Sequence, residues 1–411
     1  MNILFLGLLY HPDDIDAVLR QSRDGLQNQI NSYQWSFIDG LRKNLGPRES
    51  LHVLNALPVG AFPRHYRRWR LPAQVKPDGF QEIGSLNLPW FKQRARARRA
   101  AEAMERWIAA DPENRTVLLY TLYLPYLQAI LAVKKRHPDL KISVIVTDLP
   151  NEMGIRSGRT GLLRRIEFAR GRKSLRLAAQ LDGYVLLTEP MADAMAVRRR
   201  PFLVMEGLIA EAETMAGSFD LPDDPRPAVL YAGTLNRELG ITALLDAFQT
   251  MKDVQLWLCG RGDGEAEVRK SAETHGNIRY FGFVPQPVAL TLQAHAAALI
   301  NPRPSAGLFT RYSFPSKTLE YMRSGKPVLC CRLEGIPREY DAYLRYIEPE
   351  DAAGIRDAVR ALLSLPAAER ERLGAQAREF VRTQKNSVAQ GAKLYAFLRA
   401  VQENQPTDIN D

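Results

Sequence analysis

Residues 312–329 read YSFPSKTLEYMRSGKPVL and contain the start of a helix, its end and the beginning of a buried strand. Pro315 and Ser316 predict the helix start, with Ser316 as the N-cap residue. Gly325 predicts the helix end, and Pro327 opens a fully apolar strand. A helix that leads directly into a buried strand is typical of the βα units of parallel sheets.

The first turn of this predicted helix has the chemistry of a phosphate site. Backbone N–H groups and the helix dipole attract anions there, and Lys317 adds a positive charge. Glu320 falls one turn further on, on the same face as Ser316, where a carboxylate could accept hydrogen bonds from ribose hydroxyls. Taken alone, these residues fit a nucleotide site and a surface helix with a capping serine equally well.

Short apolar runs alternate with amphipathic stretches on both sides of this segment, which predicts an α/β protein with parallel sheets. The predicted strands are residues 2–9, 51–57, 116–121, 142–147, 183–188, 202–205, 228–232, 254–259, 278–281, 297–301, 327–331 and 344–347. The predicted helices are residues 25–41, 90–110, 124–136, 162–179, 238–251, 264–275, 287–296, 316–324, 337–340 and 352–363, with two more in 367–401.

The 411 residues, 45% hydrophobic and 25% charged, suit two or three folded domains and argue against disorder. The Pro- and Gly-containing stretch 210–227 predicts a linker between two doubly wound domains, residues 1–209 and 228–384. Residues 385–411 predict a helix that packs back on the first domain, followed by a polar tail. We expect a cleft between the carboxyl ends of the two sheets, where ligands of such folds bind.

Positive charge is concentrated in the first half of the chain. The net charge is +10, and residues 1–200 hold 32 Lys and Arg against 19 Asp and Glu, a net of +13. The densest stretches are 64–70, which also contains Trp69, and 92–99. They suit an anionic lipid surface, a phosphodiester backbone or a solvated helix face.

Several other features have ordinary explanations. The uncharged run 116–133 contains Pro125 and predicts a strand followed by a buried helix rather than a membrane span. Asp14 and Asp16 form a DxD pattern, interpreted as a solvated loop, since two carboxylates underspecify a Mg²⁺ site. The glycine-rich segment 260–264 follows a strand and is interpreted as a flexible βα turn rather than an incomplete dinucleotide fingerprint. The three cysteines lie in apolar runs, which indicates reduced thiols and a cytoplasmic protein.

Residues 312–329 resemble the nucleotide-sugar motif of glycosyltransferase family 4. The similarity continues in the expected order through residues 231–235, 256–262, 280–284 and 299–303, across most of residues 228–350. The resemblance implies the GT-B architecture of two facing Rossmann-like domains. It also implies sugar transfer that needs no metal and retains anomeric configuration.

The same resemblance implies roles for particular residues. Glu320 would bind the ribose, the backbone at Ser316 and Lys317 would meet the diphosphate, and the stretch around Val284 would border the base. The turn Gly233–Thr234 corresponds to a Gly-Arg turn in the family, and Leu239 replaces a family lysine. Stabilisation of the leaving diphosphate therefore falls to one of four other basic residues, Arg237, Arg303, Arg311 or Lys317.

On the first domain, the loops expected to face the donor are 7–16, 148–156 and the start of the first long helix at 25–29. Asp148 follows an apolar strand, so it either orients an acceptor hydroxyl as part of the catalytic site or caps a loop. His11, Gly25 and Gln29 are the predicted acceptor-binding residues.

We therefore expect a retaining hexosyltransferase that moves a sugar from a UDP-linked donor to a bacterial surface glycan, lipid-linked at the cytoplasmic face of the membrane. It would use no cofactor and no metal, touch the membrane peripherally through its basic half, and bind no nucleic acid. The alternatives are a nucleotide-sugar epimerase of similar fold, a basic nucleic-acid-binding protein and a non-catalytic partner subunit.

Overall fold

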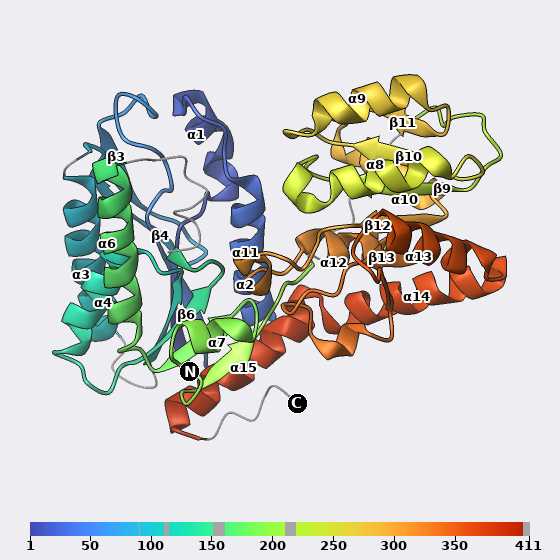
Figure 1. Ribbon diagram of the computed structural model, residues 1–411. Coiled ribbons are helices and arrows are strands. Elements are labelled where there is room, and N and C mark those ends of the chain that lie inside the picture. The colour runs from blue at the N-terminus through green and yellow to red at the C-terminus, as the bar shows by residue number, and fades with distance from the viewer. Residues whose placement is uncertain (90, 111–114, 151–160, 210–218, 406–411) are drawn as a thin grey trace. The chain divides into compact units, whose positions relative to one another are not determined.

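The computed structural model describes residues 1–89, 91–110, 115–150, 161–209 and 219–405, which fold into two compact units (Figure 1). Unit 1 comprises Met1–Ala210 together with Ser387–Asp411, and unit 2 comprises Glu211–Asn386. The predicted linker begins outside the described residues. Where the description resumes, residues 219–227 have no regular secondary structure.

The described part of unit 1 contains an eight-stranded sheet in the order β3-β4-β2-β1-β5-β6-β7-β8. The pairing is parallel except between β3 and β4, which are antiparallel. The strands are β1 (Asn2–Gly7), β2 (Ser50–Asn55), β3 (Arg70–Val75), β4 (Phe80–Leu86), β5 (Arg115–Tyr120), β6 (Lys141–Val146), β7 (Gly183–Leu186) and β8 (Phe202–Val204).

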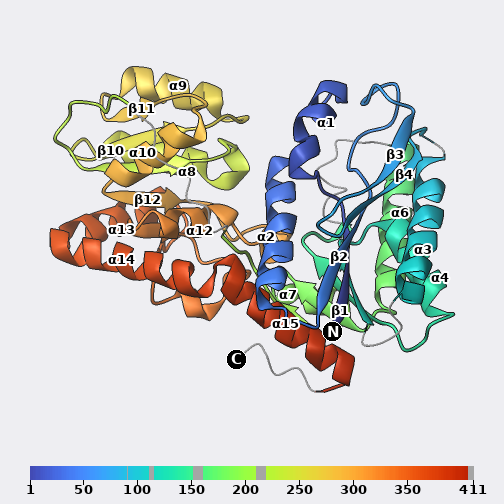
Figure 2. The same ribbon diagram turned by 180° about the vertical axis from the view of Figure 1, so that it is seen from behind.

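Helices cover both faces of this sheet (Figures 1 and 2). They are η1 (Pro12–Asp14), α1 (Ile15–Gln21), α2 (Asn28–Asn44), α3 (Lys92–Ala110), α4 (Leu124–Lys134), α6 (Gly161–Ala178), α7 (Pro190–Ala194) and α15 (Ser387–Glu403). Helices α2 and α15 pack against each other and bury apolar side chains on the sheet, among them Phe37, Leu118 and Phe397. Helices α3, α4 and α6 form the opposite layer.

Unit 1 departs from the sequence expectations in several places, among them the short helix α7, which was not predicted. The β3–β4 hairpin was not predicted, because β3 buries only Leu71 and shows no apolar alternation. The interpretation of residues 14–16 as a solvated loop was wrong, since η1 and α1 span Pro12–Gln21 and Lys76 lies 3.0 Å from the Asp14 carboxylate. The first long helix begins at Asn28, so Gly25 lies in the turn before it.

Unit 2 contains a parallel sheet in the order β11-β10-β9-β12-β13-β14. Its strands are β9 (Ala228–Ala232), β10 (Gln255–Cys259), β11 (Ile278–Tyr280), β12 (Ala298–Asn301), β13 (Val328–Cys330) and β14 (Leu344–Tyr346). Numbered within the unit, this order is 3-2-1-4-5-6, which is that of the doubly wound dinucleotide-binding folds. Two doubly wound α/β units confirm the predicted fold class.

The helical segments of unit 2 connect these strands and follow them. They are η2 (Arg237–Leu239), α8 (Ile241–Thr250), α9 (Glu265–Thr274), α10 (Gln286–His295), α11 (Leu308–Arg311), α12 (Ser316–Arg323), η3 (Arg338–Tyr340), α13 (Ala352–Ser364) and α14 (Ala367–Gln384). Helix α8 contacts α9 and α13, and α12 contacts α14. Cys259, Cys330 and Cys331 are buried free thiols within this unit.

The uncharged run 116–133 folds as predicted, into β5 and the buried helix α4. Across the residues that the structure describes, no helix combines the length and apolar character that a membrane crossing requires.

Candidate functional site

The carboxyl edge of the unit 2 sheet brings several of the predicted donor residues together. Strands β9 and β12 lie side by side, and the chain continues from them in opposite directions, to β10 and to β13. Open α/β sheets bind ligands outside the carboxyl ends of the strands at such a switch point. Gly233 and Thr234 follow β9 directly, and Arg303 lies two residues beyond β12.

Helix α12 is anchored at this same edge by Tyr321. The fully buried Tyr321 hydroxyl accepts a hydrogen bond from the Ala232 N–H (2.8 Å) and donates one to the Ala232 carbonyl (3.1 Å). Ala232 is the last residue of β9, so these two bonds bring α12 to the carboxyl end of that strand.

The cap of α12 differs from the prediction. Pro315 occupies the N-cap position with an extended backbone, and Ser316 is the first helical residue, so Ser316 is not the N-cap. The difference is one position. Ser316 and Lys317 still lie in the first turn, where a helix presents N–H groups that have no partner within it.

Glu320 is held by two donors. Its Oε2 accepts a hydrogen bond from Lys317 Nζ (2.8 Å), one turn earlier, and its Oε1 accepts one from Gln293 Nε2 (2.8 Å) on α10. Gln293 is fully buried, and its side-chain carbonyl oxygen has no hydrogen-bond partner among the described residues. Sequence reasoning did not single out Gln293, although a glutamine inside the apolar stretch of α10 was a signal.

Two further basic groups lie close to this edge. Arg303 Nη2 donates to Ser313 Oγ (2.6 Å), which connects the end of β12 to the segment before α12. Burial raises the pKa of Cys259, at the end of β10, to about 12, and the positive charge of Lys317 opposes that rise. Burial likewise raises the pKa of Tyr231, and the charge of Arg303 opposes it. The positive charges of Lys317 and Arg303 therefore lie near the ends of two adjacent strands, β10 and β9.

The glycine-rich segment 260–264 forms a close contact with the loop after β9, which corrects its interpretation as a flexible turn. The Gly233 N–H donates to the Cys259 carbonyl (3.0 Å), and the Leu235 N–H donates to the Arg261 carbonyl (2.9 Å). A Cβ on Gly260 would lie 1.8 Å from the Gly233 carbonyl oxygen, and φ at Gly260 is +135°. Only glycine fits there, so this glycine serves to pack two loops together.

The remaining predicted donor residues lie in the neighbouring loops of unit 2. The Arg237 guanidinium pairs with Glu267 on α9 at 2.7 Å, and the Arg311 guanidinium pairs with Glu334 at 2.9 Å. Val284 lies four residues beyond the end of β11. Beside it, Phe283 is 69% exposed with the Arg261 guanidinium 5.1 Å from its ring centre, a pair that sequence reasoning missed.

In unit 1, the residues predicted to bind the acceptor have different surroundings. His11 caps η1 and contacts the rings of Trp35 and Phe80, at 5.9 and 4.9 Å between centroids. Asp148 is exposed just past β6, and its charge adds to the burial that raises the pKa of Tyr120 to about 12. Gly25 is exposed in the irregular segment before α2, and Gln29 lies in the first turn of α2. Of the loop 148–156, residues 151–156 lie outside the described residues.

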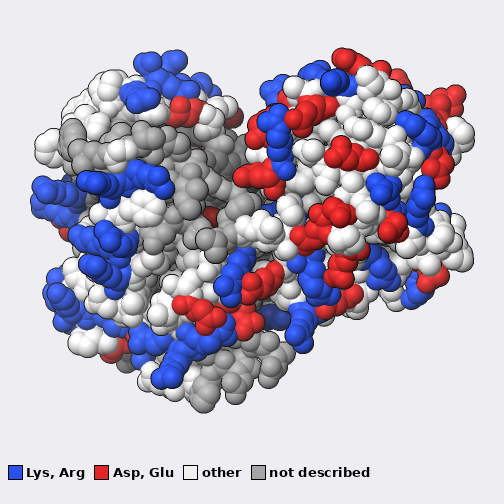
Figure 3. Space-filling model, viewed as in Figure 1, with Lys and Arg blue, Asp and Glu red and all other residues white. Residues whose placement is uncertain are grey.

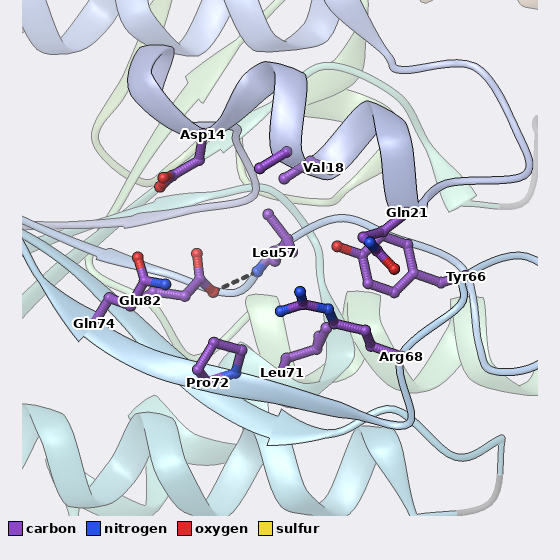
Figure 4. A pocket seen from close by; sticks show the side chains of 11 residues that line it. Asp14, Val18, Gln21, Leu57, Tyr66, Arg68, Leu71, Pro72, Gln74 and Glu82 are labelled. Carbon is purple, nitrogen blue, oxygen red and sulfur yellow. Dashed lines mark hydrogen bonds between the residues drawn. The ribbon is translucent and has the colours of Figure 1, made fainter.

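A pocket of about 110 Å³ lies between α1 and the β3–β4 hairpin of the same unit (Figure 4). Its polar lining consists of Asp14, Gln21, Tyr66, Arg68, Gln74 and Glu82. Figure 4 shows the Arg68 and Glu82 side chains pointing into the same space. The pocket was not predicted, because it depends on a hairpin that the sequence pattern did not reveal.

Glu82 forms part of the lining of this pocket and is held at both oxygens. Its Oε1 accepts a hydrogen bond from the Leu57 N–H (2.7 Å), and its Oε2 accepts one from Asn55 Nδ2 (2.7 Å). Burial raises the pKa of Glu82 to about 7 despite these donors. The pocket thus combines a carboxyl group that titrates near neutral pH with a guanidinium, a combination suited to binding hydroxyl groups.

Within the described part of the chain, no group of three or more His, Cys, Asp or Glu side chains is placed to hold a metal ion.

Comparison with known proteins agrees with this geometry. Residues 226–365 match the family model described as Glycosyl transferases group 1. No curated protein matches the chain.

Solved structures match along nearly the whole chain. Sucrose-phosphate synthase from Thermosynechococcus elongatus is 16% identical, with a TM-score of 0.61 over 97% of this chain and 99% of that chain. Trehalose-6-phosphate synthase OtsA is 11% identical, with a TM-score of 0.62 over 97% and 99%. The lipopolysaccharide outer core galactosyltransferase WaaB is 11% identical, with a TM-score of 0.61 over 98% and 99%. At these identities the likeness shows the fold: the chain has the GT-B fold of two Rossmann-like domains, and its residues 226–365 resemble the glycosyl transferases group 1 family.

Proposed function

We propose that this protein is a retaining glycosyltransferase of family 4, which transfers a hexosyl group from a UDP-linked donor to a surface glycan carried on a lipid. The observation that supports it most is the convergence at one sheet edge of Gly233, Arg303 and the first turn of α12, with Glu320 one turn further on. A nucleotide diphosphate needs N–H groups and positive charge at the phosphates and an acceptor oxygen at the ribose, and this edge supplies all of them.

In this proposal each residue has a distinct task. The first turn of α12 holds the diphosphate, and Glu320 accepts hydrogen bonds from the ribose hydroxyls. Gln293 positions Glu320, because its amide is buried and donates directly to the carboxylate. The exposed pair Phe283 and Arg261 lies beside Val284, in the stretch that would border the base of the nucleotide.

The chemistry of transfer follows from charge. As the glycosidic bond to the donor breaks, negative charge grows on the departing diphosphate, and fixed cations stabilise that charge in the transition state. Lys317 and Arg303 are the cations placed at this edge, so we assign them that role without a metal ion. In unit 1, an acceptor hydroxyl would be oriented by Asp148 or by the polar side chains of the pocket around Glu82.

Calorimetric titration with UDP and a panel of UDP-sugars tests the donor site. We expect Glu320→Ala to weaken UDP binding about 10- to 100-fold, because each hydrogen bond to a charged group contributes about 1.5–3 kcal/mol. Glu379→Ala is the matched control: Glu379 also pairs with a basic residue three positions away, Arg382, but on the exposed surface of α14. Equal UDP affinity in the wild type and Glu320→Ala would remove Glu320 from the site.

The reaction itself needs a second measurement. A glycosyltransferase consumes the UDP-sugar only when acceptor is supplied and releases UDP. A nucleotide-sugar epimerase would convert the donor with no acceptor present. Product analysis with and without lipid-linked glycan therefore separates the two activities, and conversion of the donor alone would contradict the proposal.

A further inference from the structure

A wide groove on unit 1 runs between the β3–β4 hairpin and helix α3, with a volume of about 1010 Å³. Two basic stretches that are separate in the sequence line it together. Its lining includes Arg68, Arg70, Arg94, Arg98, Arg99 and Arg106, and no Asp or Glu stands among the described lining residues. We call it the arginine groove.

Most of this positive charge is not neutralised by the protein. Arg98 and Arg99 share a single carboxylate, that of Glu102, at 2.8 and 3.2 Å. The other four arginines form no ion pair with any residue that the structure describes. In Figure 3, Lys and Arg side chains predominate on the part of unit 1 that carries α3 and α6, whereas both signs mix over unit 2.

The start of α3 strengthens the same field. The first turn of a helix carries a partial positive charge and is usually stabilised by acidic residues. The first turn of α3 instead contains Lys92 and Arg94, and it has no acidic residue. Burial, and to a lesser extent the charge of Arg96, lowers the pKa of Lys92 to about 7.

Large apolar side chains are exposed around the groove. Phe91 and Leu86 line it with 60% and 39% of their surfaces exposed, and Trp69, between Arg68 and Arg70 in the chain, is 53% exposed. Aromatic and aliphatic side chains interleaved with arginine suit the boundary between lipid headgroups and acyl chains.

We propose that the arginine groove docks unit 1 onto an anionic lipid surface. The guanidinium groups bind phosphate oxygens of the headgroups, and the exposed apolar side chains enter the headgroup region. This inference does not depend on the donor site, and such docking would bring unit 1 to the lipid-linked acceptor of the proposed function.

A single-stranded nucleic acid is the main competing occupant, since arginine and aromatic side chains also bind phosphodiesters and bases. Aromatic rings would stack on bases, but the exposed aliphatic side chain of Leu86 in the groove offers no such stacking. A lipid surface makes use of both kinds of apolar group, so it accounts for more of what is exposed.

Co-sedimentation of the full chain with vesicles tests the docking. We expect binding to vesicles of phosphatidylcholine and phosphatidylglycerol, weaker binding as salt rises, and little binding to phosphatidylcholine alone. Arg70→Glu, Arg94→Glu and Arg106→Glu combined should reduce partitioning by about a hundredfold or more, at roughly a fivefold loss per removed charge near an anionic membrane. The triple variant with Gln at the same three positions should also lose vesicle binding, but less of it. It replaces the Glu variant if the Glu variant does not fold.

A charge-matched control separates the groove from general basicity. Arg170→Glu, Arg172→Glu and Arg176→Glu change exposed arginines of α6, in the same unit, by the same total charge. This control should lose far less vesicle binding than the groove variant. An equal loss would overturn the assignment of binding to the groove.

Further arms test the lipid itself. Phe91→Ser should reduce the vesicle binding that survives at high salt, because that part depends on apolar insertion. Soluble inorganic diphosphate should compete only weakly. Binding of single-stranded RNA more tightly than vesicles, or of diphosphate as tightly as vesicles, would show that the groove is not a lipid surface site.

Discussion

Folding strongly raises the pKa of the Glu82 carboxyl group. Burial favours the neutral form, and the donors at Asn55 and Leu57 offset this only in part, which raises the pKa from 4.5 to about 7. Between about pH 4.5 and pH 7, Glu82 is therefore protonated in the folded state and ionised in the unfolded chain. The stability associated with that proton is fully present below about pH 4.5 and is lost as the pH rises through about 7.

Replacement of Glu82 by Gln tests this sign. The neutral amide cannot ionise, so the stability of the variant relative to the wild type should rise by up to about 3 kcal/mol between about pH 5 and pH 8. Gln accepts through one oxygen only and loses one of the two hydrogen bonds that Glu82 accepts, a loss that is the same at every pH. Urea unfolding at several pH values measures the rise.

Glu105 provides the opposite case. A hydrogen bond from His137, with Arg136 nearby, lowers the pKa of Glu105, so ionised Glu105 stabilises the fold. We therefore expect Glu105→Gln to be no more stable than the wild type at any pH. A stability difference for Glu82→Gln that is the same at acid and alkaline pH would contradict the assigned titration.

At the level of elements, the loops after β9 and β10 behave as one piece of structure. The Gly264 N–H donates to the Leu235 carbonyl (2.8 Å), and Gly262 approaches Leu235 so closely that a Cβ there would lie 2.3 Å from its carbonyl oxygen. These contacts hold Gly233 and Thr234 in place at the carboxyl end of β9, the strand to which Tyr321 anchors α12. The glycines of residues 260–264 therefore shape the proposed donor site without touching the donor.

Gly260→Ala should disrupt this pairing. The new methyl group would overlap the Gly233 carbonyl oxygen, at a φ that side chains rarely adopt, so we expect a loss of about 2–4 kcal/mol in the free energy of unfolding. Gly276→Ala is the control, because a Cβ there would meet nothing within 4 Å. It should change stability by less than about 1 kcal/mol. Similar unfolding midpoints for the two variants would show that the loops rearrange to accept a methyl group at little cost, which would contradict this prediction.

For the whole molecule, the last helix ties the end of the chain to its beginning. Helix α15 follows α14 of unit 2 but packs on α2 of unit 1, where Leu394, Phe397 and Leu398 are fully buried. The two helices approach closely at Gly40 and Gly391, where a Cβ on Gly391 would lie 2.4 Å from the Gly40 backbone. The core of unit 1 is thus incomplete until the C-terminal residues are present.

Phe397→Ala tests this dependence. Loss of a fully buried aromatic side chain should cost about 3–5 kcal/mol in unit 1. Trp257 is the single tryptophan of residues 211–386, so in a Trp257→Phe background tryptophan fluorescence reports unit 1 alone. We expect a clear fall in the urea midpoint of that signal, and almost none for Arg399→Ala on the exposed face of α15. An unchanged midpoint for Phe397→Ala would mean that α15 contributes little to the core.

The hairpin and the groove show where sequence reasoning stopped. The arginines of both basic stretches are visible in the sequence, and their charge predicts an anionic partner. That Arg70 and Arg94 line one groove depends on β3, a strand whose exposed residues carry no apolar period. Likewise, the hydrogen bond between Gln293 and Glu320 joins residues on two helices that no local pattern connects.

By itself, the sequence determined the two doubly wound units, their parallel strands and the position of the helix that bears Ser316, Lys317 and Glu320. Those features rest on local physics: apolar run length, helical spacing, and proline and glycine at the ends of elements. Only the tertiary structure decided that Tyr321 anchors this helix to β9, that α15 completes unit 1, and that Glu82 and the arginines of unit 1 line a pocket and a groove. Each of these depends on contacts between residues far apart in the chain, whose energies appear only once the strands have been ordered within their sheets.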